Sequence, residues 1–465
     1  MFFVTFVANS SLWPSARSAA QTSPAAGAPA GRVNIPFADA RPILEALRSD
    51  LLPLELQGKQ GAQLESTWPG WVSRRDAEIR SRLAGGDEDS IITFLLFGVT
   101  FTNQPRYSFA AWAGGHPPQG RAEDIVAGDP AVQVRIKDMV AGMASPGGSE
   151  RLQFARQVAQ RHGIDPATAA GRQEAEQFLL GALKRLLSDY DVYFRESSPG
   201  STLFRDRGLS SDTSIYAAFA IDAALTDMKS KGAIRAGSVR RVAVIGPGLD
   251  FTDKQEGYDF YPVQTIQPFG VIDSLRRLGL ADAGALQMTT YDLSPRVNQH
   301  LDAARQRARV GAAYRVQLPR DTAQPWHPDL LAYWTRFGER IGEPAAAIAP
   351  PPALGKVQVR AVSIRPDVVQ AITPRDVDII LQRPDPLPDA ERFDLVIATN
   401  ILIYYDVFEQ SLALANVSKM LRPGGVLLTN NPLFELPALP VHQVGETKAI
   451  YTSGGFDWIA WYQRE

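Results

Sequence analysis

The chain has 465 residues and no cysteine, with 45% hydrophobic residues, 21% charged residues and a formal net charge of −2. This length is too great for one ordinary hydrophobic core, and the composition is typical of a soluble globular protein. The missing cysteines exclude disulfides, thiolate metal sites, iron–sulfur clusters and a cysteine nucleophile, and the near-neutral charge gives no nucleic-acid signature.

The first segment, residues 1–33, fits two interpretations. A short apolar run at residues 2–8 is followed by small residues at 16–20 and by a stretch rich in Ala, Pro, Ser and Gly. A disordered tail and a signal peptide both fit, although no Lys or Arg precedes the apolar run. No later stretch is apolar enough to span a membrane. We expect a cytoplasmic protein, with export as the alternative.

Residues 34–235 are predicted to form an α-helical accessory domain. Apolar residues recur at helical spacing in 173–190 and in 214–231, and the second segment ends with Lys231 and Gly232. Residues 90–101 are almost continuously apolar and predict a buried core helix. No catalytic constellation stands out in this half.

From residue 236 to the end the pattern changes to alternating strands and helices. Strands are predicted at 241–245, 286–291, 377–381, 393–399 and 426–430, and a terminal hairpin at 448–452 and 457–462. Helices are predicted at 268–278, from Ser294–Pro295 to Gly311, and from Asp406, which forms a capping box with Glu409. An insertion at about 319–356 carries an aromatic-rich short helix and a Pro/Ala linker.

Four features in this half place glycine turns or polar side chains, which could bind a ligand, at strand ends. Gly246-Pro247-Gly248 follows the first strand, Asp292 ends the second, Asn400 ends the fourth, and a Pro-Gly-Gly turn at 423–425 leads into the fifth. The carboxyl edge of a parallel sheet is where open α/β folds bind nucleotides. Each feature also has a structural interpretation, because glycine turns are common and Asp292 could cap the next helix, a role that Ser294 is expected to fill.

The order of VAVIGPG, YDLSPR, FDLVIATN and LRPGGVLL resembles class I S-adenosylmethionine-dependent methyltransferases over residues 238–465. NILIYYD is also similar to a segment of the chemotaxis-receptor methyltransferases, but Thr399 stands where that subfamily has arginine, so its receptor-glutamate substrate is not carried over. The resemblance implies an α/β fold, a Rossmann-like and mostly parallel methyltransferase sheet ending in an antiparallel hairpin, preceded here by the helical domain.

The resemblance also implies S-adenosylmethionine as cofactor and assigns roles to residues of this chain. The cofactor would be bound by residues that follow the first, second and fourth strands: Gly246, Pro247, Gly248, Asp250, Tyr291, Asp292, Leu293 and Asn400. Among these, Asp292 would hold the ribose diol and Asn400 would lie near the sulfonium. Asp385 or Gln382 would meet the adenine amine.

The methyl acceptor is not identified by the sequence. Asn400, Tyr404, Tyr405 and Asp259 are candidates for the acceptor side, and Asp406 is favoured as a helix cap only. The loop at 251–267 is expected either to cover the cofactor or to be plain surface.

Two other functions stay open. A non-catalytic, methyltransferase-like scaffold or binding protein is one, because the chain leaves the family pattern after Gly248. A nicotinamide-dependent Rossmann enzyme is the other, although the third glycine of GxGxxG is missing.

Overall fold

The computed structural model describes residues 31–108, 121–196, 203–252, 257–282, 284–385, 387–430 and 432–465. Residues 1–30 of the segment interpreted as a tail or signal therefore lie outside the described residues. Residues 253–256, in the loop after the first predicted strand, also lie outside them.

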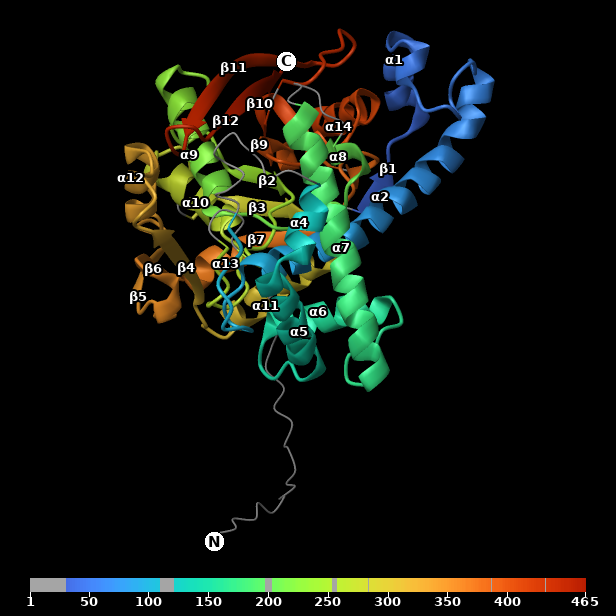
Figure 1. Ribbon diagram of the computed structural model, residues 1–465. Coiled ribbons are helices and arrows are strands. Elements are labelled where there is room, and N and C mark those ends of the chain that lie inside the picture. The colour runs from blue at the N-terminus through green and yellow to red at the C-terminus, as the bar shows by residue number, and fades with distance from the viewer. Residues whose placement is uncertain are drawn as a thin grey trace, which may run out of the picture.

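A seven-stranded sheet occupies the centre of the molecule (Figure 1). Its strands are β2 (Arg241–Ile245), β3 (Gln287–Tyr291), β7 (Ile372–Arg375), β9 (Phe393–Ala398), β10 (Leu421–Asn430), β11 (Val441–Ile450) and β12 (Phe456–Arg464). They lie in the order β11-β12-β10-β9-β2-β3-β7; the five from β10 to β7 are mutually parallel, and β12 is antiparallel to both β10 and β11. The predicted mostly parallel sheet with a terminal antiparallel hairpin is confirmed.

Helices cover both faces of this sheet, which explains why its central strands are apolar throughout. Residues 242–245 of β2 and 395–398 of β9 are all buried. One face packs against α9 (Ile215–Ser230), α10 (Gln267–Arg277) and α11 (Pro295–Arg309). The other packs against α14 (Val407–Met420), α1 (Phe37–Ala46) and the first half of α2 (Ala62–Phe97).

The chain between α11 and β7 leaves the central sheet and forms a second, three-stranded antiparallel sheet. Its strands are β4 (Tyr314–Asp321), β6 (Val357–Ile364) and β5 (Gly342–Ala345), in that spatial order. The short helix expected in the insertion is α12 (Pro328–Arg336), and α13 (Pro366–Gln370) leads back to β7. The small sheet was not predicted, because its strands lie partly outside the insertion and contain prolines.

The prediction of a third strand at residues 377–381 is wrong. The strand is β7, at Ile372–Arg375, and residues 377–381 form a buried turn behind it. The Asp378 carboxylate accepts the Ile380 N–H at 3.0 Å, and the Asp378 carbonyl accepts the N–H of Gln382 at 2.6 Å. These local hydrogen bonds thus take the place of the strand pairing that the apolar residues at 377–381 predict.

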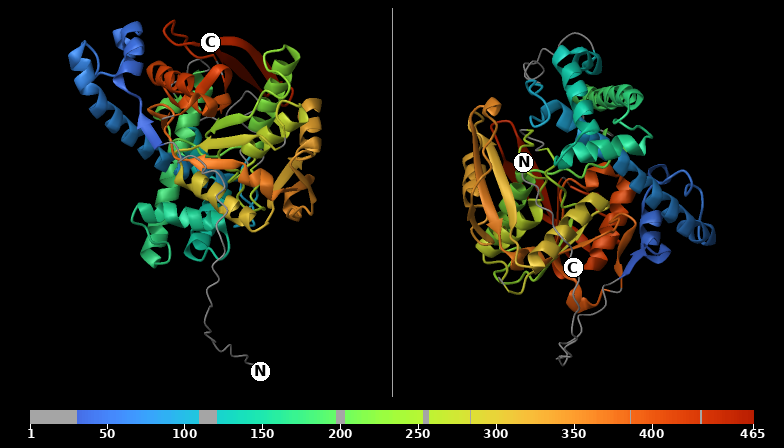
Figure 2. Two further views of the ribbon diagram at one scale, coloured as in Figure 1. Left: turned by 180° about the vertical axis from the view of Figure 1, so that it is seen from behind. Right: turned by 90° about the horizontal axis from the view of Figure 1, so that it is seen from below.

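The amino-terminal helices contribute to two cores. The second half of α2 packs with α4 (Ala122–Gly128), α5 (Pro130–Ala144), α6 (Glu150–Arg161) and α7 (Ala169–Glu196), and these helices form a lobe beside the sheet (Figure 2). The first half of α2 lies against the sheet side instead, where Trp68 and Trp71 contact Phe408 of α14 with ring centroids 6.5 and 5.5 Å apart. Strand β1 (Gly31–Asn34) pairs antiparallel with β8 (Gln382–Asp385).

The remaining elements are short. They are α8 (Leu203–Asp206) and the 3-10 turns η1 (Ser49–Leu51), η2 (Pro352–Leu354), η3 (Asp389–Glu391) and η4 (Leu402–Tyr404). The helix predicted at 173–190 lies within α7, and the helix predicted at 214–231 agrees with α9 to within one residue at each end. Of the helix predicted at 90–101, residues 90–97 form the mostly buried end of α2, and residues 98–101 lie beyond it. The predicted capping box of α14 is present, with Asp406 accepting the Glu409 N–H at 2.9 Å.

Candidate functional site

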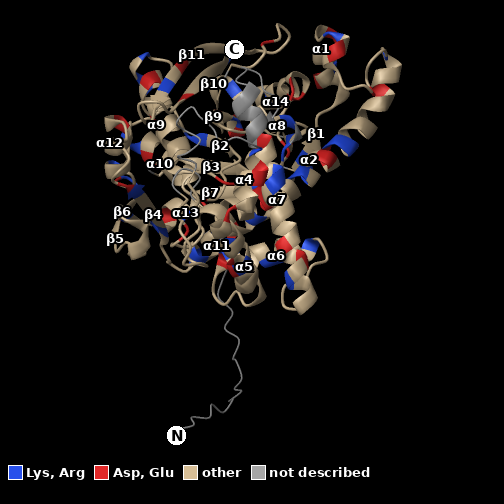
Figure 3. Ribbon diagram, in the orientation of Figure 1, with Lys and Arg blue, Asp and Glu red and all other residues tan. Residues whose placement is uncertain are grey.

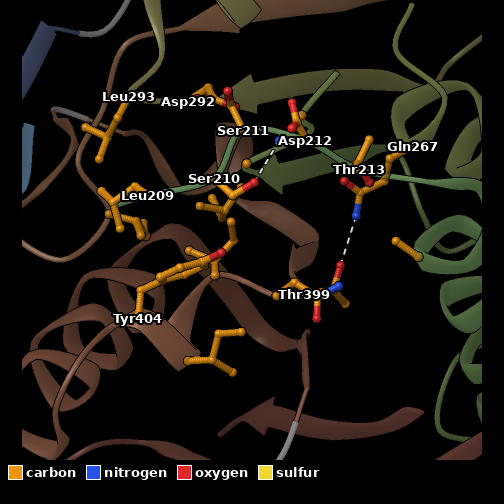
Figure 4. Close-up of a pocket in the computed structure, with 18 of the residues that line it drawn as sticks. Leu209, Ser210, Ser211, Asp212, Thr213, Gln267, Asp292, Leu293, Thr399 and Tyr404 are labelled. Carbon is orange, nitrogen blue, oxygen red and sulfur yellow. Dashed lines mark hydrogen bonds between the residues drawn. The ribbon is translucent and has the colours of Figure 1, made fainter. Parts of the chain in front are cut away.

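A cavity of about 350 Å³ lies at the carboxyl edge of the central sheet, around the ends of β2, β3 and β9. Here the strand order reverses direction, since β2 has β3 on one side and β9 on the other, and such a switch point is where α/β folds bind ligands. Eight of the residues singled out in the sequence line this cavity: Gly246, Gly248, Tyr291, Asp292, Leu293, Asn400, Tyr404 and Tyr405. Figure 4 shows several of its walls, with Asp292 and Leu293 at one end and Gln267 and Thr399 at another.

The turn after β2 requires glycine at two positions. Gly246 and Gly248 have φ of 62° and 64°, in the left-handed region. A Cβ on Gly246 would lie 2.1 Å from Ile401 Cδ1, and one on Gly248 would lie 3.0 Å from the Ser211 carbonyl oxygen. The two glycines therefore leave bare backbone at the cavity wall, whereas Pro247 between them does not line it.

Asp292 is a buried carboxylate held by backbone donors. Its Oδ1 accepts the Ser294 N–H at 2.8 Å, and the Gly248 N–H donates to the carboxylate as well. Burial outweighs these hydrogen bonds and raises the pKa of Asp292 to about 7. Ser294 occupies the N-cap position of α11 and Pro295 follows it, as predicted, but the Ser294 side chain makes no capping hydrogen bond.

Asn400 has a strained backbone at the end of β9. Its φ of 60° is the only positive value at a non-glycine position among the described residues, and asparagine tolerates that region better than most residues. Its N–H donates to Asn430 Oδ1 at 2.6 Å. Beside it, Gln267 Nε2 donates to Thr399 Oγ1 at 2.9 Å, which ties the start of α10 to the end of β9 (Figure 4). Strain maintained in this way is a common property of ligand sites.

The two tyrosines after β9 differ in what they can do. Tyr404 is half-buried, and its ring packs edge-on against Phe204 with centroids 5.6 Å apart. Tyr405 is buried under the Arg82 guanidinium, and burial raises its pKa well above the ordinary value. The Tyr405 hydroxyl is therefore harder to ionise than that of an exposed tyrosine.

Asp250 and Asp259 do not line the cavity. Asp250 Oδ2 accepts hydrogen bonds from Tyr261 and Gln264 behind the glycine turn. Asp259 accepts both backbone N–H groups of residues 99 and 100 and the Thr100 hydroxyl, which secures the end of α2. Both carboxylates hold the structure together, and neither is among the residues that line the cavity. Of the described residues of the loop 251–267, only Gln267 lines it.

Asp385 and Gln382 also lie away from the cavity. Both belong to β8, where they pair with β1, and Gln382 Nε2 donates to Asn34 at 3.2 Å. Asp406 likewise serves only its helix, as the capping box shows. The cavity is instead lined by an acid that the sequence analysis missed.

That acid is Asp378, in the buried turn after β7. It is fully buried, lines the cavity, and its Oδ2 has no hydrogen-bond partner among the described residues. Burial raises its pKa to about 7. An acidic residue inside an otherwise apolar run, V-D-I-I-L, was the available signal.

The segment 209–214, just before α9, forms a second unpredicted wall (Figure 4). It runs beside the glycine turn, where Leu249 N–H donates to Ser211 O at 2.7 Å and Thr213 N–H donates to Leu249 O at 2.8 Å. Its other support is α2, because Leu209 N–H donates to Arg82 O. Serine-rich loops carry no periodic signal, and nothing in the sequence indicated this contact.

Close backbone contact between α2 and this segment predicts a sharp effect of Gly86→Ala. A Cβ at Gly86 would lie 1.9 Å from the Leu209 carbonyl oxygen, so the segment has to move. We expect Gly86→Ala to weaken binding of a cavity ligand at least fivefold and to lower thermal stability. Calorimetric titration and thermal unfolding measure the two effects.

The matched control is Gly181→Ala, also within a helix, whose added Cβ meets nothing within 4 Å. It should leave binding unchanged and stabilise the fold slightly, by about 0.5–1 kcal/mol. Equal behaviour of the two variants would contradict the role of the contact.

The described residues contain no cluster of side chains able to hold a metal ion, and none of the described helices is long and apolar enough to cross a membrane. Basic and acidic residues are interspersed along the helices in the view of Figure 3, without a face of one sign.

Comparison with known proteins gives structural likeness only. No family model matches the chain, and no curated protein matches it. The N-methyltransferase NodS from Bradyrhizobium japonicum is 14% identical, with 52% of this chain and 94% of that chain covered and a TM-score of 0.24. A TehB-like SAM-dependent methyltransferase from Corynebacterium glutamicum is 10% identical, covering 60% and 97%, with a TM-score of 0.25. The glycopeptide N-methyltransferase MtfA, solved with S-adenosylmethionine, is 12% identical, covering 52% and 66%, with a TM-score of 0.20.

These values are too low to assign an activity. The three solved structures named above are described as methyltransferases.

Proposed function

We propose that the protein binds S-adenosylmethionine in this cavity and transfers its methyl group to an acceptor. The observation that carries the proposal is the pair of buried carboxylates, Asp292 and Asp378, at the ends of the neighbouring strands β3 and β7. An adenosyl group offers a ribose diol and an exocyclic amine, all of them hydrogen-bond donors. Carboxylates are acceptors, and the Oδ2 atom of Asp378 has no partner without such a donor.

The glycine turn supports the same ligand. Bare backbone at Gly246 and Gly248 lets a small ligand approach β2 closely. Neighbouring strands lie about 4.8 Å apart, so with adenine at β7 and ribose at β3, the sulfonium that joins the ribose to the methionine part would lie at the end of β2, beside its neighbour β9. Asn400 and Thr399 line the cavity at that strand.

A nicotinamide dinucleotide fits this site less well. Its pyrophosphate would need N–H groups at a helix start directly after the glycine turn. Here the next helix, α10, begins only at Gln267, and its second residue, Pro268, has no N–H. The geometry therefore favours the sulfonium cofactor over the dinucleotide.

The residues of this chain contribute binding, orientation and exclusion of water. The cofactor, when bound, supplies a methyl group on a good leaving group. Asp292 and Asp378 would orient the adenosyl part, Asn400 and the Gln267–Thr399 pair would shape the wall at the reacting end, and segment 209–214 would cover the cavity. In-line methyl transfer depends chiefly on such positioning and desolvation.

Titration calorimetry of the purified protein tests the proposal. We expect S-adenosylmethionine and its demethylated product, S-adenosylhomocysteine, to bind with dissociation constants in the micromolar range, and NAD⁺, which shares the adenosine part, to bind at least tenfold more weakly. Absence of binding of both sulfur compounds to folded protein, or tighter binding of NAD⁺, would reject it.

A further inference from the structure

The cavity extends beyond the proposed cofactor along the edge of the sheet. Tyr451 follows β11 and Asp457 lies at the start of β12, and both line the cavity. The strand order puts β12 two positions past β9, on the side away from β7. The main chain of β12 is therefore about 10 Å from that of β9, on the side away from Asp378, and the side chains of Tyr451 and Asp457 reach into the cavity from there.

Aromatic rings and a carboxylate meet at this end. Tyr451 donates its hydroxyl to Asp457 Oδ2 at 2.5 Å. The Tyr216 ring, from the first turn of α9, lies 4.7 Å from the Tyr451 ring centroid to centroid, and Tyr216 also lines the cavity. The Asp457 side chain makes no other hydrogen bond to the described residues, which leaves its Oδ1 available to a ligand.

The electrostatics of this end distinguish between classes of acceptor. Burial raises the pKa of Asp457 above its ordinary value. The Tyr451 hydrogen bond lowers it only in part, and no cation contributes. No Lys or Arg is among the residues that line the described cavity. An anionic acceptor would be repelled by Asp457, whereas an ammonium ion would gain both the carboxylate and the negative faces of the tyrosine rings.

We propose that the methyl acceptor is a small amine, bound as its ammonium ion by Asp457 beside the packed rings of Tyr451 and Tyr216. This inference rests on the proposed methyltransferase function and adds the class of substrate to it.

The transfer step balances with these groups. The ammonium ion gives one proton to the Asp457 carboxylate, and the freed nitrogen lone pair forms a bond to the methyl carbon. The carbon–sulfur bond breaks and its electron pair stays on sulfur, which leaves a neutral thioether and an N-methylammonium product. Asp457 thus acts as a general base as well as a binding group.

A matched pair of probes tests the acceptor class. n-Butylammonium and 1-butanol have similar shapes but differ in charge, and ligand-detected NMR measures the binding of each to protein saturated with S-adenosylhomocysteine. The proteins are wild type, Asp457→Asn, Tyr451→Phe and the control Asp329→Asn, an exposed acid on α12. Calorimetry of S-adenosylhomocysteine is run on each.

We expect wild type and Asp329→Asn to bind butylammonium at least fivefold more tightly than butanol. In Asp457→Asn the preference for butylammonium should fall below twofold. In Tyr451→Phe the preference should be smaller than in wild type but still present. The dissociation constant of S-adenosylhomocysteine should change less than twofold in every variant.

Two results would overturn the inference. Equal binding of the two probes by wild type would show no amine preference. A loss of cofactor affinity above fivefold in Asp457→Asn would assign the carboxylate to the amino group of the cofactor. If S-adenosylhomocysteine does not bind at all, the proposed function fails, and the same probe comparison without it still decides whether this end of the cavity selects an amine.

Discussion

Replacing Asp292 with alanine is expected to weaken binding of S-adenosylhomocysteine by more than tenfold while the protein stays folded. Asp292 is the acceptor at the end of β3, and hydrogen bonds to a charged group contribute about 1.5–3 kcal/mol each. Titration calorimetry gives the affinity, and circular dichroism reports the fold. Unchanged affinity would show that the carboxylate does not hold the ligand.

The same carboxylate gives the affinity a dependence on pH. Because burial raises its pKa to about 7, Asp292 is largely protonated at pH 6 and loses its strength as an acceptor. A ligand that binds only the ionised form should bind about eightfold more weakly at pH 6 than at pH 7.5 through this group alone. Asp292→Asn should flatten that part of the profile, and an equally steep profile in the variant would assign the pH dependence elsewhere.

Replacing Asp378 with asparagine is expected to have opposite effects on stability and on binding. The wild-type carboxylate is fully buried, with one oxygen unpartnered and a pKa raised to about 7. Keeping it ionised in the folded protein costs about 4 kcal/mol at pH 8. The amide has no charge, so we expect Asp378→Asn to unfold at higher urea concentration at pH 8, although cofactor affinity falls at least tenfold.

The sign of the pH effect follows from the direction of the pKa shift. An acid whose pKa is higher in the folded state stabilises the fold at low pH, and that contribution is lost as the pH rises through the folded value of about 7. The advantage of Asp378→Asn should therefore shrink by about 2–3 kcal/mol from pH 8 to pH 5. Asp389→Asn, at an exposed side chain, is the control and should show no such change. A constant difference between wild type and Asp378→Asn would contradict the buried charge.

The parts of the fold that depend on local chemistry were predictable from the sequence. Strand β2 has the predicted bounds, and β9 agrees to within one residue, because continuous apolar runs between turn residues indicate buried parallel strands. The start of α14 was readable from its capping box, and the hairpin from Gly454-Gly455. Among the cavity residues, those after β2, β3 and β9 were found because strand ends are where this fold presents ligand groups.

The parts that depend on tertiary contacts were missed. The apolar residues at 377–381 are typical of a buried strand, but the Asp378 carboxylate accepts the backbone N–H of Ile380 and lines the cavity instead. Asp250 and Asp259 resembled site residues, yet Asp250 holds its own loop through Gln264, and Asp259 holds the end of α2 through Thr100, far away in sequence. Segment 209–214 reaches the site only because α2 and the glycine turn support it. None of these contacts leaves a periodic pattern.

The pairing of β1 with β8 has a consequence for how the chain is made. Arg32 to Asn34 and the tryptophans of α2 meet their partners near residues 382–385 and at Phe408. Ribosomes add about 5–20 residues per second, so roughly 20–70 s separate synthesis of the two sides. Throughout that interval Trp68, Trp71 and Ile35, all buried in the finished protein, can pack on one another and on α1 but lack Phe408 and the other α14 residues that complete their core. These apolar side chains thus stay incompletely covered until residues 382–408 have been made.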